Sequence, residues 1–328
     1  MRFAKKVGYT LESSSIALDP TYDWDNTTTY ARGDLVSYTD PITGASYFYL
    51  SNHDGNLNFT VDQVKHWTCV APTNQWAMFS DYFDSFSEYS GGDLTVELQI
   101  DGSLDTITFT GVVASEINVY VYASEGGALL EQRQILVTDY LLPEAYLKTL
   151  TDEETYYNLF YYYLNTVRTD PFIVITFVPL SGLSVRCGKF FAGESYYVGE
   201  TQHKATSKVS DYSGGTFNEF GVYEETVGAY SATIAGDVYI EDSTTDETFA
   251  KLKEVVSSPC LWDFNNVDTA HTALVAYGFL RVVETKFEAT NATFIFLEVL
   301  TATSRRVNSV EVEQIAPALF YYRGYTSV

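Results

Sequence analysis

Cysteine, histidine and basic residues are scarce in this chain of 328 residues. There are three cysteines and four histidines, and only 19 Lys and Arg stand against 43 Asp and Glu. Cys69, Cys187 and Cys260 are far apart and form no CxxC pair, which makes a zinc site improbable. An odd number of scattered cysteines is typical of a protein that folds in a reducing cytosol with its thiols buried and free.

The shortage of basic residues leaves a net charge of −24. This charge argues against a nucleic-acid-binding surface, because phosphate contacts need clustered Lys and Arg, and it argues equally against anionic lipid. A cation site in an acidic cluster is the specific alternative, but no calcium loop of the D-x-D-x-D-G type occurs. We interpret the charge as a source of solubility, and we expect no metal and no cofactor.

Long apolar runs and a secretion signal are also missing. No segment approaches 18 uninterrupted apolar residues, so no transmembrane helix is expected. Three basic residues near the start, Arg2, Lys5 and Lys6, are followed by no apolar run, unlike a signal peptide. We therefore expect a protein made in the cytoplasm of its host cell.

Catalytic signatures are absent from the sequence. It contains no G-x-S-x-G, no H-E-x-x-H and no P-loop. Acidic pairs such as Asp81 with Asp84 arise by chance in a chain with 43 acids. The histidines stand alone in the sequence, at His53, His66, His203 and His271. Because an activity must be argued from a site, we expect no enzyme here.

Aromatic residues, by contrast, are abundant, with 27 Tyr and 21 Phe. Tyr, Phe, Thr and Val favour strands over helices. Four runs are predicted as strands separated by turn residues: "LTVELQI", "TITFTGVV", "INVYVYA" and "RQILVTDYLL". The run "FIVITFVPL" is typical of a fully buried strand. The sequence predicts a mainly β protein: a small β module at 1–70, a jelly-roll-like β-sandwich with its junction at 71–200, and a β-rich domain at 201–328.

One short helix is predicted near 246–257. Thr244 to Glu247 fits a capping box, and Pro259 follows as a stop signal. The apolar residues expected on its buried face are Phe249, Leu252 and Val256. After the helix, "CLWDF", "ALVAYGFLRVVETKF" and "TFIFLEVLTA" are predicted as strands, and the ambiguous stretch 152–165 is assigned to a strand preceded by a turn.

The first 70 residues are dense in aromatic rings. A turn at 40–44 predicts a hairpin between two Tyr-containing runs, and a second turn falls at 52–56. A module this small cannot bury every ring, and exposed flat rings make sugar-stacking platforms; the alternative is that they are core and interface rings. The candidate carbohydrate-binding residues are Trp24, Tyr30, Tyr38, Tyr47, Tyr49 and Trp67.

The stretch "YARGDLVSY…GASYFYLSNHDGN…W" resembles the small chitin-binding-type module of bacterial chitinases. The matching positions, within roughly 20–68, are Tyr30, Gly33, Asp34, Val36, Tyr38, Gly44, Tyr47 and Trp67. The loop between Tyr38 and Gly44 is longer here than is usual in that module. The resemblance implies a carbohydrate-binding role for this part of the chain.

The stretch "PTNQWAMFSD" resembles a "P-T-N-R-W-x-M-F-D" signature of bacteriophage virion proteins, where it joins the same small module to a β-sandwich body. Gln75 replaces the usual Arg, and Ser80 displaces the usual Asp. The candidate junction residues are Asn74, Trp76, Met78 and Phe79. A later pattern also resembles that family, at Gly188, Gly193, Gly199, Thr201, Asp211, Tyr212, Ser213, Phe220 and Gly221.

The resemblance implies a structural subunit of a bacteriophage tail, neck or baseplate, located in the virion. Its partners would be copies of itself and other tail proteins, with bacterial surface glycan as an additional contact. The alternative is a carbohydrate-binding protein of host recognition. A glycan depolymerase is a third reading, and it would require two carboxylates about 5–9 Å apart in a cleft.

Overall fold

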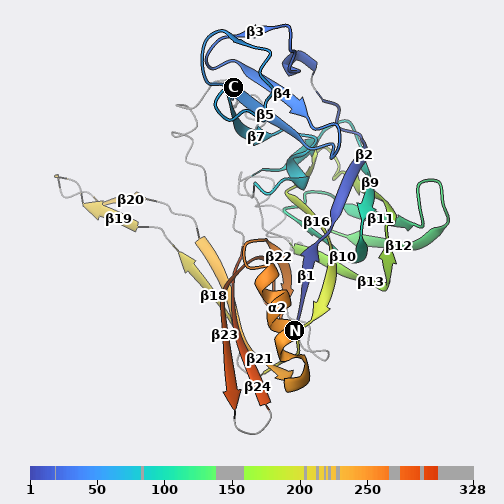
Figure 1. Ribbon diagram of the computed structural model, residues 1–328, viewed down its shortest axis with the longest axis vertical. Coiled ribbons are helices and arrows are strands. Elements are labelled where there is room, and N and C mark those ends of the chain that lie inside the picture. Colours follow the sequence, from blue (N-terminus) through green and yellow to red (C-terminus); the bar gives the residue numbers. More distant parts are fainter. Residues whose placement is uncertain are drawn as a thin grey trace.

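The computed structural model describes residues 1–18, 20–82, 85–137, 159–202, 205–211, 214–217, 219–220, 223–226, 230–265, 274–288 and 292–301. These residues are mostly strands in curled antiparallel sheets, with one short α-helix, so the prediction of a mainly β protein is confirmed (Figure 1). No helix in this described part has the length and apolar character needed to cross a membrane.

Two large antiparallel sheets form the body. Sheet A contains, in spatial order, β13 (Leu159–Thr169), β10 (Ser103–Thr110), β16 (Lys189–Tyr197), β1 (Arg2–Lys6), β22 (Cys260–Asp263), β23 (Val275–Glu288), β24 (Ala292–Thr301), β21 (Tyr230–Glu241) and β17 (Glu200–Thr201), with β18 (Thr206–Asp211) also on β21. Sheet B contains β12 (Leu129–Leu136), β11 (Glu116–Tyr122), β14 (Phe172–Val178), β9 (Leu94–Asp101) and β2 (Gly8–Ser14).

Smaller sheets complete the fold. They are β4 (Leu35–Thr39), β5 (Ser46–Ser51) and β7 (Trp67–Pro72); β3 (Thr29–Tyr30) with β6 (Asn56–Leu57); β8 (Ser87–Tyr89) with β15 (Val185–Cys187); and β19 (Gly214–Phe217) with β20 (Tyr223–Thr226). The short 3-10 helices are η1 (Pro20–Tyr22), η2 (Ala77–Phe79) and η4 (Asp242–Thr244). The hairpin predicted around 40–44 is confirmed as β4 and β5.

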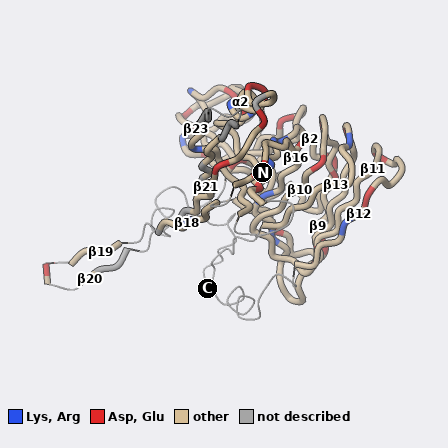
Figure 2. Tube along the Cα trace, turned by 90° about the horizontal axis from the view of Figure 1, so that it is seen from below, with Lys and Arg blue, Asp and Glu red and all other residues tan. Residues whose placement is uncertain are grey.

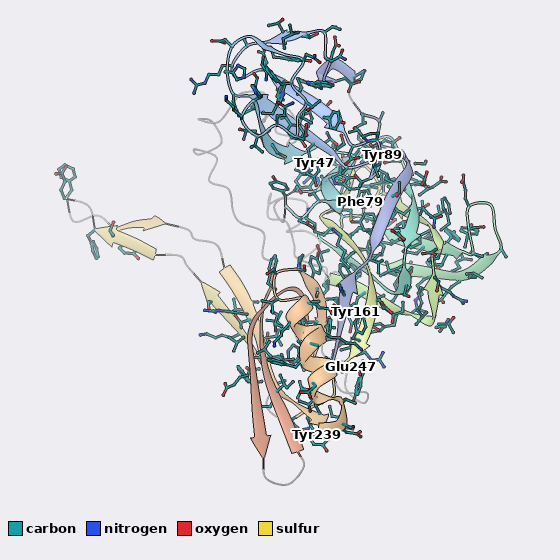
Figure 3. All side chains as sticks on the ribbon, in the orientation of Figure 1. Tyr47, Phe79, Tyr89, Tyr161, Tyr239 and Glu247 are labelled. Atoms are coloured by element: carbon teal, nitrogen blue, oxygen red, sulfur yellow. The ribbon has the colours of Figure 1, made fainter. Side chains whose placement is uncertain are left out.

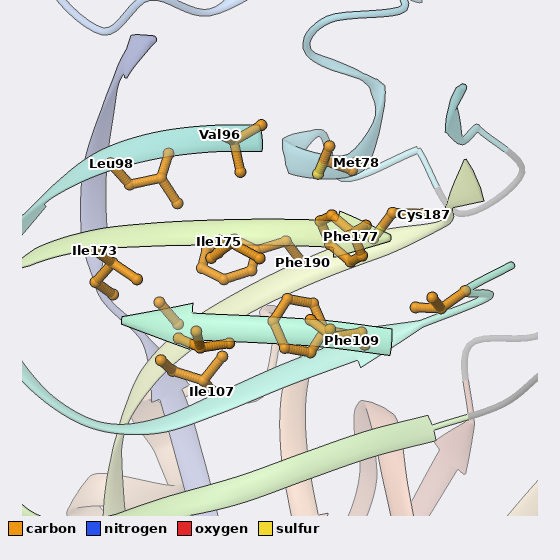
Figure 4. Packing of buried hydrophobic residues seen from close by; sticks show 14 of the residues in the cluster. Met78, Val96, Leu98, Ile107, Phe109, Ile173, Ile175, Phe177, Cys187 and Phe190 are labelled. Carbon is orange, nitrogen blue, oxygen red and sulfur yellow. The ribbon is translucent and has the colours of Figure 1, made fainter. Parts of the chain in front are cut away.

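The sandwich core lies between sheet B and the β13–β10–β16 end of sheet A. Apolar side chains from both sheets, such as Phe109, Ile175 and Phe177, are fully buried there (Figure 4). The strand β14 alternates between buried and half-buried residues, although "FIVITFV" was expected to be buried on both faces. Only one face of this strand meets the core, since the other is turned away from sheet A.

The first 14 residues do not belong to the front module. They form two strands of the large sheets instead. Strand β1 lies between β16 and β22, and β2 forms an edge of sheet B beside β9. The strand pairing therefore departs from the start expected for the front module at residue 1 and from the boundary expected at 200. The front module starts near residue 20, and sheet A runs without a break from the sandwich into the C-terminal region. Pairing partners this distant in sequence leave no local signal.

The predicted helix is present as α2 (Thr245–Glu254), but its predicted cap is wrong. Thr244 ends η4 with helical dihedral angles, so its hydroxyl donates to the Glu241 carbonyl and accepts no hydrogen bond from a free N–H of the first turn. Glu247 pairs instead with Lys251, at 2.7 Å. Leu252 is buried as expected, whereas Val256 lies beyond the helix with 46% of its surface exposed.

The strands expected after the helix are confirmed as β22, β23 and β24. Parts of two other predictions lie outside the described residues. The run "RQILVTDYLL" is a strand as far as Leu136, and 138–142 are not described. The stretch 152–165 is a strand from Leu159, and 151–158 are not described.

Three glycines of the sequence pattern lie where two backbones come close together. A Cβ on Gly188 would be 2.8 Å from the Thr110 carbonyl oxygen, and one on Gly193 would be 2.7 Å from that of Lys5. At Gly199 the corresponding distance, to the Tyr239 carbonyl oxygen, is 2.1 Å. A side chain has no room at these positions, so the close approach of the two backbones explains why each of them is a glycine.

We predict that Gly199→Ala lowers the free energy of unfolding by about 2–3 kcal/mol, because the β21 backbone must move to admit the methyl group. Gly214→Ala is the matched control, since a Cβ there would meet nothing within 4 Å. Urea unfolding, followed by circular dichroism, measures the free energy of unfolding of both variants. Equal stability of the two variants would contradict the close approach.

Candidate functional site

Three of the candidate sugar-binding rings belong to the core of the front module. Trp67 is 2% exposed, and its indole N–H donates to the Phe59 carbonyl at 2.8 Å. Tyr30 packs edge-on against Trp67, with ring centroids 5.2 Å apart, and Trp24 also packs against this small core. Tyr38 and Tyr49 pack against the same small core, so all five of these rings help to stabilise the module.

The other three candidates, Tyr38, Tyr47 and Tyr49, share one face of the β4–β5–β7 sheet. Tyr38 is directly opposite Tyr47, and residues opposite each other in an antiparallel pair lie on the same face, as do residues two apart in one strand. Tyr82 joins them: its ring centroid lies 6.4 Å from that of Tyr47. We call Tyr38, Tyr47, Tyr49 and Tyr82 the tyrosine face.

The tyrosine face is partly exposed and carries phenol hydroxyl groups. Tyr82 has 42% of its surface exposed, and the other three rings are half-buried. Burial raises the pKa of Tyr49 to about 12 and also raises the pKa of Tyr47. Their hydroxyl groups therefore stay protonated at neutral pH and can both donate and accept hydrogen bonds.

The rings of this face are not coplanar. The planes of Tyr47 and Tyr82 meet at 53°, and those of Tyr38 and Trp24 at 82°. A flat sugar ring would therefore meet one tyrosine at a time, with phenol hydroxyls beside it. This geometry differs from the exposed coplanar platform that a dedicated carbohydrate-binding module was expected to show.

The junction peptide connects the tyrosine face to the sandwich core. Trp76, Met78 and Phe79 are 6%, 0% and 2% exposed and belong to the core cluster of the sandwich. Figure 4 shows Met78 among the buried side chains of this cluster. The Trp76 indole N–H donates to the Tyr47 hydroxyl at 3.2 Å. Figure 3 shows Tyr47 in the front module and Phe79 close to it in the body. Apolar anchoring thus ties the front module to the body.

Polar side chains of the junction bind backbone groups. Asn74 donates to the Glu88 carbonyl and accepts from the Glu88 N–H, both at 2.8 Å, like a short piece of strand pairing. Gln75, which stands where the resembling signature has Arg, donates to the Ile16 carbonyl at 2.8 Å. Ser80 donates to the Ala77 carbonyl at 2.9 Å. Gln75 and Ser80, the two residues that depart from the signature, therefore each make a neutral hydrogen bond to a backbone carbonyl.

Sequence reasoning missed Lys189, which lies in "CGKFF" with no distinguishing signal. This lysine is 3% exposed, and its ammonium donates to the Ala77 carbonyl and the Ser85 hydroxyl, each at 2.8 Å. Ser80 Oγ lies 3.3 Å from the same nitrogen. Because a buried charge is costly without hydrogen bonds, these contacts fix the junction turn against β16.

Two histidines that stand apart in the sequence meet in the structure. His53 Nε2 and His66 Nδ1 are 2.5 Å apart, and Phe59 stacks on His66 with centroids 3.6 Å apart. Desolvation, together with the neighbouring His53, lowers the pKa of His66. The expectation that the histidines stand alone is therefore wrong for this pair, because the chain between them folds back.

Within the described residues no group of three or more His, Cys, Asp and Glu side chains is arranged to hold a metal ion. Cys187 and Cys260 are free and buried as expected, and burial raises the pKa of each thiol to about 12. Cys69 is free but exposed, so the expectation of burial is wrong there. Asp81 is paired with Lys6 at 3.1 Å, and Asp84 lies outside the described residues.

No protein-family model and no curated protein matches this chain. The site itself offers aromatic and hydroxyl contacts on one surface and a fixed connection to the sandwich behind it. Such an arrangement offers ring faces for stacking and hydroxyl groups for hydrogen bonds.

We predict that Lys189→Met lowers the free energy of unfolding by about 2 kcal/mol, since the junction turn loses its charged donor. Lys6→Met is the control: Lys6 also lies near the junction, but its ion pair with Asp81 is exposed, and its loss is expected to cost about 0.5 kcal/mol. Chemical unfolding curves of both variants test the difference. A smaller loss for Lys189→Met than for Lys6→Met would disprove the anchoring role.

Proposed function

We propose that this chain is a structural subunit of a bacteriophage tail, acting in the tail, neck or baseplate by binding copies of itself and other tail proteins. The resemblance of its junction and glycine pattern to virion proteins suggests the class. The observation that carries the proposal is a projecting hairpin with exposed aromatic residues.

The hairpin β19–β20, which we call the arm, extends away from the body beyond β18 (Figure 1). Phe217, Phe220 and Tyr223 at its tip have 72%, 81% and 55% of their surface exposed. The rings of Phe217 and Tyr223 are 5.2 Å apart and form a small cluster. Aromatic residues gathered on a projecting element favour contact with another protein, because burying them removes apolar surface from water.

The body supports the same proposal. Sheet A joins the sandwich to the C-terminal region, and the buried junction holds the front module against the sandwich, which suits a rigid building block. Acidic residues are spread over the elements of the body (Figure 2), and their repulsion would keep free subunits apart before assembly.

The tyrosine face favours glycan contact as a second candidate function. Its partly exposed rings and protonated hydroxyls suit stacking on sugars and hydrogen bonding to them. In a tail subunit this contact would be made with bacterial surface glycan; in a free host-recognition protein it would be the main activity.

For assembly, we predict that the purified wild-type chain forms defined rings or tubes, and that the double variant Phe217→Ser with Phe220→Ser does not. The change removes the aromatic contact area of the arm. Sedimentation velocity and negative-stain electron microscopy of the full chain measure the outcome.

The control for the arm is Ile42→Ser with Val64→Ser, two residues of the front module that are 83% and 86% exposed. This variant is expected to assemble like the wild type. A wild-type chain that stays monomeric at every concentration would disprove the structural role and make glycan binding the leading function.

For glycan contact, we predict that Tyr82→Ala weakens binding of N-acetylglucosamine oligomers about tenfold, because stacking on its exposed ring is lost. Tyr197→Ala is the control, since this tyrosine is 62% exposed but lies on β16 in the body. Isothermal titration calorimetry measures both. Absence of binding by the wild type, or equal affinity of Tyr82→Ala and wild type, would rule out this surface.

A further inference from the structure

Strand β12 forms an edge of sheet B with unusual exposed apolar side chains. It pairs with β11 on one side, and no described strand pairs with its other side. Leu129, Leu130 and Leu136 have 49%, 37% and 44% of their surface exposed. An exposed edge strand offers unpaired N–H and C=O groups, and proteins usually protect such edges from pairing with another chain.

The hydrogen bonds of the β11–β12 ladder show which residues face the open edge. The Val137 N–H donates to the Ser115 carbonyl at 3.0 Å, and the pairing then continues in steps of two residues through Ile135 and Arg133. In an antiparallel ladder the residues between these pairs direct their backbone groups the other way. Gln132 and Gln134 therefore present N–H and C=O groups to the open edge.

We infer that two copies of this chain pair through β12, antiparallel and edge to edge, about a two-fold axis at Gln132. Each Gln132 would then exchange both backbone hydrogen bonds with the Gln132 of the other copy. Such a contact uses the same surface on both copies and closes after two subunits. Sheet B would become one continuous sheet across the pair.

The charges on β12 favour an axis at Gln132 over an axis at either neighbouring residue, Glu131 or Arg133. Opposite residues in an antiparallel pair lie on the same face, so the axis must pass through one residue of the strand. An axis at Glu131 would oppose two carboxylates, and an axis at Arg133 would oppose two guanidinium groups. With the axis at Gln132, Glu131 of each copy is opposite Arg133 of the other, which gives two ion pairs of opposite charge.

The geometry of the ladder favours these ion pairs. Because Gln132 is opposite its own copy in a hydrogen-bonded pair, the flanking Glu131 and Arg133 form non-hydrogen-bonded pairs, in which side chains are closest. The Asn165 N–H of β13 donates to Glu131 Oε2 at 3.2 Å, which positions this carboxylate at the rim of the sandwich. The exposed leucines at the ends of the strand would be covered by the second copy.

This pairing does not depend on the proposed function, since a tail subunit and a free glycan-binding protein could both use it. It also involves neither the arm nor the tyrosine face. Assembly through the arm and pairing through β12 can therefore succeed or fail separately.

Engineered disulfides test the register directly. In a Cys69→Ser background, which removes the exposed thiol, we expect Gln132→Cys to form a covalent dimer under mild oxidation, because the two new thiols lie across the axis from each other. Gln134→Cys is the matched control: it also faces the open edge, but its two copies would be four residues apart along the strand, about 13 Å. Non-reducing gel electrophoresis separates a chain of 36.8 kDa from a product of twice that mass.

Dimer formation by Gln132→Cys but not by Gln134→Cys supports the pairing and its register. Equal crosslinking of the two variants, or none in either, overturns it.

A charge test gives a second measurement: Arg133→Glu alone and Glu131→Arg alone should each weaken self-association on the order of tenfold. Mixing these two variants should restore association as a heterodimer, and failure to restore it would also contradict the inference.

Discussion

The buried contact between Lys189 and the junction turn holds the front module against the sandwich. The ammonium group comes from β16, a central strand of sheet A, and its acceptors come from the turn that follows the front module. Around it, Trp76, Met78 and Phe79 fill one end of the sandwich core. Since an unsatisfied buried charge is costly, the turn can occupy only the position that supplies these acceptors. Together with the apolar anchors and the hydrogen bonds of Asn74 and Gln75, this constraint sets how the front module meets the body.

The connection continues into the tyrosine face. The Trp76 indole N–H reaches the Tyr47 hydroxyl, so a residue of the sandwich core is bonded to a residue of the outer surface. A partner or glycan that contacts Tyr82 therefore contacts a surface supported from behind. Rigid support of this kind lowers the entropy lost on binding, because fewer side chains need to be ordered.

Local sequence patterns predicted most of the strands and the helix. They did not predict which strands pair when the partners are far apart in the sequence. Alternating Tyr, Val and Thr runs indicated the strands, and the apolar spacing indicated α2. The position of β1 between β16 and β22 was missed, because Phe3 and Ala4 are buried by residues nearly 200 and 260 positions away. For the site, the junction pattern indicated the buried turn, but neither Lys189 nor the His53–His66 contact left a sequence signal. The candidate rings were identified as a set, but the sequence did not show that five of them pack on one small core of the front module and that Tyr47 packs against the sandwich core.

The place of β1 has a consequence for how the protein is made. A ribosome releases residues 2–6 first, yet both strands that flank them emerge much later, and β22 ends only at Asp263. The middle of sheet A therefore cannot close until most of the chain has been synthesised. Contacts between such distant segments slow folding and leave strand edges unpaired meanwhile. The early strand therefore has an unpaired edge during synthesis, and the acidic charge of the chain would help to keep unfinished copies apart.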